Sequence, residues 1–181
     1  MARYLALLRG INVGGRNLIK MTELKSCFAE QGFEDVVTYI QSGNVVFGSG
    51  VSDVAGLTRH IERMLSETFD YPASAVLRSR RQMRAIVDGA PKGFGADPSR
   101  YRYDVIFLKA PLSAKTAIKR VTTRADVDDA RAGSGVLYFS RLVSRASQSY
   151  LSKIVTIPEY QRMTIRNWNT TTKLVRLMEG S

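Results

Sequence analysis

The stretch YLALLRGINVGGRN, residues 4–17, sets the start of the fold. Residues 4–8 form an almost unbroken apolar run, which is typical of a central β-strand. The run ends at Arg9, and the glycines that follow predict a loop reaching to Lys20. Apolar side chains at helical spacing over residues 21–28 then predict a helix. The chain therefore opens as a strand, a glycine-rich loop (the opening loop, residues 9–20) and a helix.

Working outward from this stretch, the same kinds of element recur. In the first half we expect a hairpin over 36–47, a helix over about 52–69, a short strand at 75–78 and a helix at 80–87. In the second half we expect strands over 103–109, 127–132 and 136–140, and helices over 113–122, 144–154 and 166–178. Ser113 is the expected cap of the helix that follows it.

Each half reads as strand, helix, hairpin and helix, and the first half adds a further strand. This order predicts an α+β protein with two ferredoxin-like subdomains on antiparallel or mixed sheets, and a C-terminal helix. Residues 89–101 hold three glycines and two prolines, which favours a linker. The predicted limits are therefore 1–88 for the first subdomain and 102–181 for the second, which includes the terminal helix.

Length and cysteine content point to an intracellular protein. The chain has 181 residues, and a chain of this length can bury about 70% of the surface that it exposes when unfolded. We therefore expect it to fold without a metal or a disulfide. Cys27 is its single cysteine, so no intrachain disulfide can form. No signal-peptide pattern and no run of about 18 apolar residues is present. We expect a cytoplasmic protein that does not contact the membrane.

The charge is strongly and unevenly basic. The formal net charge is +11 at pH 7. Residues 1–90 hold 11 Lys/Arg and 9 Asp/Glu, a net +2, whereas residues 91–181 hold 16 and 7, a net +9. Such a bias favours polyanionic partners such as nucleic acid. The alternative is a basic surface that serves solubility alone.

The opening loop is the first candidate site, because glycines and basic side chains coincide before a helix. Glycines let backbone N–H groups approach a ligand, and a helix N-terminus favours anions. Neither the Walker A pattern nor the dinucleotide Gly-x-Gly-x-x-Gly pattern is present. The alternative is that the glycines supply positive φ for a tight crossover. The candidate ligand-binding residues here are Arg9, Asn12, Gly14, Gly15, Arg16 and Lys20.

Two further groups of polar residues are candidates. Gln41, Ser42 and Asn44 gather donors and acceptors at the tip of the first hairpin, although Ser and Asn are also ordinary turn residues. In the last segment, Trp168, Thr171, Val175 and Met178 form one helical stripe, which indicates core packing. A second stripe contains the candidate ligand contacts Arg166, Asn169 and Lys173. Thr164 is a possible cap for this helix.

Metal and catalytic signatures are weak. His60 is the only histidine, and one Cys with one His cannot make a standard zinc site. Asp126, Asp128 and Asp129 lack the spacing and glycine of an EF-hand. We therefore expect no metal, no cofactor and no identified catalytic residue.

Three strings resemble a bacterial family, domain of unknown function 1697. They are LLRGINVGG at residues 7–15, GFEDV at 32–36 with TYIQSGNVVF at 38–47, and TIRNWNT at 164–170 followed by Lys173 and Leu174. The resemblance spans nearly the whole chain. It implies a two-subdomain α+β fold with ferredoxin-like halves and brings no established activity or catalytic residue.

Three hypotheses of function follow. The first is binding of a phosphate-bearing ligand, either nucleic acid or a nucleotide, through the Arg/Gly loop. The second is an enzyme acting on a small anionic substrate; no general base lies in the three motifs, so an enzyme is the less favoured reading. The third is a protein-interaction or self-association module in which sheet edges pair between chains. We expect the protein to be a monomer or a homodimer.

Overall fold

The first sheet is assembled around β1 (Ala2–Leu8), the apolar strand that opens the chain. In the computed structural model, which describes residues 1–180, the strand order is β2-β3-β1-β4 and every pairing is antiparallel. The other strands are β2 (Glu34–Tyr39), β3 (Asn44–Ser49) and β4 (Ala75–Ser79). With a helix after β1 and another after β3, this is a ferredoxin-like unit.

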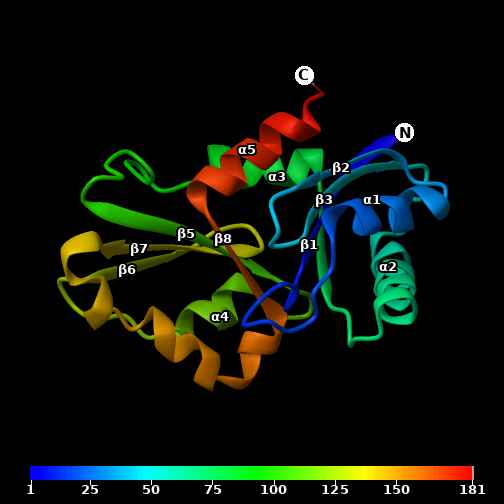
Figure 1. The fold of residues 1–181 in the computed structure, drawn as a ribbon. Helices are drawn as coiled ribbons and strands as arrows, with labels where there is room; N and C mark the ends of the chain where they lie inside the picture. The colour runs from blue at the N-terminus through cyan, green and yellow to red at the C-terminus, as the bar shows by residue number, and fades with distance from the viewer. Residues whose placement is uncertain (181) are drawn as a thin grey trace. The chain divides into compact units, whose positions relative to one another are not determined.

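Two helices, α1 (Met21–Glu30) and α2 (Val54–Phe69), lie side by side against one face of this sheet (Figure 1). Phe28 of α1 and Ile61 of α2 are fully buried against Phe47 of β3. Burying a side chain of this size contributes about 1.5–3 kcal/mol. Cys27 lies buried on the same face of α1.

The second sheet repeats the arrangement around β5 (Tyr101–Leu108), with the order β6-β7-β5-β8 and antiparallel pairing throughout. Its other strands are β6 (Asp128–Ala132), β7 (Val136–Leu142) and β8 (Met163–Asn167). Helix α4 (Ala114–Arg120) packs on one face, and Ser113 caps it by accepting the Thr116 N–H at 3.2 Å. The α+β class with two ferredoxin-like subdomains is therefore confirmed.

The helix predicted over 144–154 is wrong. The chain forms three 3-10 segments there, Val143–Gln148, Leu151–Thr156 and Pro158–Arg162. The carboxylate of Asp128 accepts the Ser149 hydroxyl at 2.6 Å and the Tyr150 N–H at 2.8 Å. Because a continuous α-helix would use the Tyr150 N–H internally, this contact fixes the break between the first two segments.

The last helix begins later than predicted. Arg166 lies in β8, and α5 runs over Trp168–Met178. The side chain of Asn167, not Thr164, accepts the Thr170 N–H at 2.8 Å and caps the helix. Met163 and Ile165 pair with β5, so the second half also gains a fourth strand.

The chain forms two compact units, one made of Met1–Met83 with residues 173–180 and the other of Arg84–Thr172. Helix α3 (Arg80–Asp88) and α5 each contribute residues to both units. Within residues 1–180, no helix combines the length and the apolar character needed to cross a membrane.

Candidate functional site in the second unit

The opening loop is braced by two asparagine side chains. Asn12 Nδ2 donates to the carbonyl oxygens of Ile19 at 3.0 Å and Gln41 at 2.8 Å, and its Oδ1 accepts the Ile19 N–H at 2.8 Å. Asn17 Nδ2 donates to the Gly10 carbonyl oxygen at 2.8 Å. Both asparagines hold positive φ, a conformation that Asn adopts more readily than most residues. The amide of Asn12 therefore fixes the shape of the loop.

The glycine pair of the loop forms a tight turn. Gly14 and Gly15 have φ of 58° and 72°, and the Arg16 N–H donates to the Val13 carbonyl oxygen at 3.0 Å. Positive φ at both central positions is the geometry for which glycine is favoured. The turn leaves the side chains of Arg16 and Lys20 exposed.

The hairpin tip packs directly on the opening loop. A Cβ at Gly43 would lie 2.7 Å from Ile11 Cδ1, so the glycine allows the close approach. Asn44 is fully buried, and its Nδ2 donates to the Tyr39 carbonyl oxygen at 2.9 Å and to Ser42 Oγ at 3.0 Å. The structure thus brings two of the predicted motifs together. At the tip, Gln41 is the predicted site residue that stands exposed.

The third predicted group is divided. Arg166 is buried in β8, where burial lowers the pKa of its guanidinium to about 10. Its Nη1 donates to the Ile165 carbonyl oxygen at 3.0 Å. Lys173 is exposed on α5, and Asn169 is exposed at the start of that helix, where it lines a cavity.

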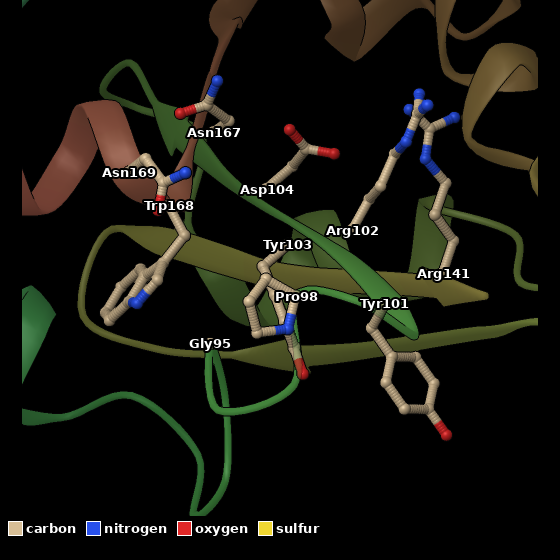
Figure 2. A pocket seen from close by; sticks show the side chains of 10 residues that line it. All are labelled: Gly95, Pro98, Tyr101, Arg102, Tyr103, Asp104, Arg141, Asn167, Trp168 and Asn169. Atoms are coloured by element: carbon tan, nitrogen blue, oxygen red, sulfur yellow. The ribbon is translucent and has the colours of Figure 1, made fainter. Parts of the chain in front are cut away.

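That cavity, of about 410 Å³, lies within the second unit at the point where β8 ends. The pairing of β5 with β7 begins at Tyr101, whereas the pairing of β5 with β8 begins at Asp104. Beyond Asn167 the chain turns into α5, which leaves a notch beside the start of β5 (Figure 2). The lining residues are Gly95, Pro98, Tyr101, Arg102, Tyr103, Asp104, Arg141, Asn167, Trp168 and Asn169.

The notch joins two faces of the sheet that β5 would otherwise separate. Successive side chains of a strand point to opposite faces, so Tyr101 and Tyr103 lie on one face and Arg102 and Asp104 on the other. Figure 2 shows Arg102 and Asp104 on one side of β5, and Trp168 on the other side with Tyr101. A ligand in the notch would meet a charged side and an aromatic side at once.

The charged side carries two arginines from neighbouring strands. Arg102 and Arg141 are direct cross-strand partners, and like charges placed opposite each other are destabilising. Within residues 1–180, Arg141 Nε is buried and donates to no acceptor. Burial raises the pKa of Asp104, while the charges of Arg141 and Arg102 oppose that shift. Arg102 is exposed to solvent, and Asp128 of β6 is the other cross-strand partner of Arg141. An anion in the cavity would supply the acceptor that Arg141 Nε lacks.

The aromatic side is rigidly supported. The ring of Phe94 packs edge-on against Trp168, with centroids 5.1 Å apart, and against Tyr103 at 4.9 Å. Gly95 has a φ of 83°, and a Cβ there would overlap the Trp168 indole. Residues 89–101, for which the composition predicts a linker, thus supply Gly95 to the wall of the cavity and Phe94 to the support behind that wall.

Asn169 is the one predicted site residue that lines the cavity. Trp168, which the sequence assigns to core packing, is half-buried and lines the cavity as well. Asp104 and the two arginines were missed, because their approach depends on strand register. One signal was available: the run Tyr-Arg-Tyr-Asp at 101–104 places two charges in a strand that is apolar beyond it. No group of three or more potential metal ligands occurs in the part of the chain that the structure describes.

Comparison with known proteins places the chain in a family. The family model described as protein of unknown function (DUF1697) matches residues 1–138. The chain belongs to the DUF1697 family. The structure of the conserved bacterial protein SP0830 from Streptococcus pneumoniae is similar to it, with 28% sequence identity, coverage of 98% of each chain and a TM-score of 0.84. The comparison with curated proteins gives no match. The DUF1697 match includes Asp104 and ends before Arg141 and Trp168.

Proposed function

We propose that this DUF1697 protein binds a phosphate-bearing ligand, a nucleotide unit either free or within a nucleic-acid chain, in the cavity beside β5. The observation that carries the proposal is the pairing of Arg102 and Arg141 next to an aromatic wall. Arginine matches phosphate through two parallel N–H donors. Stacking of a base on an aromatic side chain contributes about 1–3 kcal/mol. The cavity volume of about 410 Å³ falls in the range of small-molecule sites.

The distribution of charge supports the same ligand class. Residues 91–181, which include most of the second unit, carry a net +9. A field of this sign attracts phosphates over several ångströms and speeds their association. Asn167 and Asn169 add neutral amide groups at the rim of the cavity, which can orient a base or sugar by hydrogen bonds.

The single tryptophan provides the assay. Trp168 is the only tryptophan in the chain and lines the cavity, so a bound base should quench its fluorescence. We expect saturable quenching by nucleotides, weakened at least about 10-fold when Arg102 and Arg141 are both changed to alanine, because each charged hydrogen bond contributes about 1.5–3 kcal/mol. The control is Arg145→Ala, which removes one positive charge where Arg145 bonds to Gln148. Equal affinity in all three proteins would contradict the proposal.

Mononucleotides and single-stranded oligonucleotides distinguish the two sources of the ligand. Binding to a strand releases counterions, so its affinity falls with salt with a log–log slope of about −0.7 for each phosphate contacted. A mononucleotide gives a shallow slope. An oligonucleotide that binds much more tightly and with a steeper slope than the mononucleotide would identify nucleic acid as the ligand.

In the first unit, we propose that the opening loop is a further phosphate contact, through Arg16 and Lys20. Both side chains are exposed on a loop whose backbone is held by Asn12 and Asn17. The double variant Arg16→Ala with Lys20→Ala is expected to reduce oligonucleotide affinity and the salt slope, with mononucleotide quenching of Trp168 unchanged. An unchanged salt slope would exclude the loop from binding.

A further inference from the structure

We infer that the cavity beside β5 selects guanine, with Asp104 accepting hydrogen bonds from the edge of the base. This inference rests on the proposed nucleotide function and names the base that the site takes. Asp104 is the one carboxylate among the ten lining residues. Figure 2 shows its side chain between those of Asn167 and Arg102.

The elimination follows from the hydrogen-bond groups of the bases. An ionised carboxylate only accepts, and its two oxygens suit two parallel N–H donors. Guanine presents two adjacent donors, at N1 and the 2-amino group. The edges of adenine and cytosine each place an amino group beside a ring acceptor that would face the second carboxylate oxygen. Uracil places one N–H between two carbonyl groups. Guanine is therefore the common base whose edge satisfies both oxygens of Asp104.

The neighbours of Asp104 fit the rest of a guanine nucleotide. Amide groups can donate to the 6-carbonyl oxygen, and Asn167 and Asn169 lie at the same end of the cavity. The Trp168 indole offers a stacking surface that Phe94 holds in place. Arg102 and Arg141 lie on the other side of Asp104 (Figure 2). The N1 and 2-amino edge of guanine lies opposite the glycosidic bond, so the phosphate of an anti nucleotide would point away from these arginines. In the syn conformation the 5′-phosphate lies beside the 2-amino group, and the inference therefore includes a syn guanine nucleotide whose phosphate contacts Arg102 and Arg141.

The burial of Asp104 adds a second reason. The residue is half-buried, and burial is the main cause that raises the pKa of its carboxyl group. A carboxylate that loses water in the complex must regain hydrogen bonds from the ligand, or binding is penalised. A base with two donors meets that need, whereas a base that turns an acceptor toward Asp104 is rejected.

Comparison of GMP, IMP, AMP and CMP tests the inference by Trp168 fluorescence at one fixed salt concentration. IMP lacks only the 2-amino group of GMP. Because a bidentate contact discriminates by about 10- to 100-fold, GMP is expected to bind at least about 10-fold more tightly than IMP, AMP or CMP. The phosphate is common to all four ligands, so the comparison isolates the base.

A substitution at Asp104 gives a result that loss of structure could not mimic. In Asp104→Asn the amide oxygen still accepts the N1–H, while the amide nitrogen donates and so matches the 2-carbonyl oxygen of xanthine. This variant is expected to lose its preference for GMP and to bind XMP about 10-fold more tightly than wild type does. Asp129→Asn is the matched control, because Asp129 pairs with Arg131 at the surface and the charge change is the same.

The outcomes separate the inference from the function beneath it. Equal binding of all four nucleotides by wild type overturns guanine selection and leaves nucleotide binding intact. Quenching by none of them overturns both. If Asp104→Asn fails to fold, the ratio of GMP to IMP affinity in wild type decides the question. A ratio near one refutes a carboxylate contact with the 2-amino group.

Discussion

Replacement of Asn12 tests whether a residue in the most distinctive motif of the chain serves the fold. Asn12→Ala removes three hydrogen bonds, two to Ile19 and one to Gln41. At about 1 kcal/mol each, with less for the exposed bond to Gln41, the loss is about 2–3 kcal/mol. The φ of Asn12 is 53°, where alanine costs about 1 kcal/mol more. We expect destabilisation of about 3–4 kcal/mol.

Urea unfolding is the direct assay, and the slope of unfolding free energy against urea concentration should be the same in variant and wild type. The corresponding thermal result is a fall of about 10 °C in Tm. Asn12→Gly separates the two causes: it loses the same bonds but relieves the backbone, and it should be about 1 kcal/mol more stable than the alanine variant. Asn17→Ala is the control, since it loses a single exposed bond to Gly10 and should cost about half as much. A loss below about 1 kcal/mol in Asn12→Ala, or a glycine variant less stable than the alanine variant, would refute the bracing role.

Three further predictions concern the second unit. Gly95→Ala should lower stability by about 2–4 kcal/mol and shift the fluorescence maximum of Trp168, because the added Cβ overlaps the indole at a positive φ; an unchanged spectrum and Tm would contradict this. Tyr138→Phe should cost about 1–2 kcal/mol in denaturant unfolding, because the buried hydroxyl donates to the Ile86 carbonyl oxygen at 2.5 Å; a neutral result would show that this bond contributes nothing net. Burial raises the pKa of Asp104, so the folded state holds its proton to higher pH than the unfolded state, and stability from this group is lost as pH rises from about 4 through the raised value. Asp104→Asn should therefore flatten the decline of unfolding free energy across that window, and an identical pH profile would count against the raised pKa.

Local patterns in the sequence were sufficient for most of the fold. The apolar run that became β1, the 3.6-residue spacing of α1 and α2, and the hairpin turns each report on neighbours a few residues apart. Because successive elements of a ferredoxin-like unit are short and their order is simple, those local signals predicted the four strands of the first sheet, three of the four strands of the second sheet and the Ser113 cap.

Where the predictions from the sequence were wrong, a contact between residues far apart in the chain was responsible. The segment 144–154 has helical composition, yet Asp128 takes the Tyr150 N–H and breaks it into 3-10 turns. Strand β8 is short, and its identity depends on pairing with β5, more than fifty residues earlier. Helix and strand propensities depend on residues a few positions apart, so they do not report the contact with Asp128 or the pairing with β5.

The candidate sites divide in the same way. The sequence by itself determined the opening loop, its basic side chains and its turn glycines, because these depend on local backbone demands, and it determined the basic bias of the second half. Only the tertiary structure decided that Asn12 braces the loop and that Arg102, Asp104, Arg141 and Trp168 line one cavity. The reason is physical: the cavity exists because β8 ends at Asn167 while β5 continues beyond it, and the register of paired strands is a property of the fold rather than of any single segment.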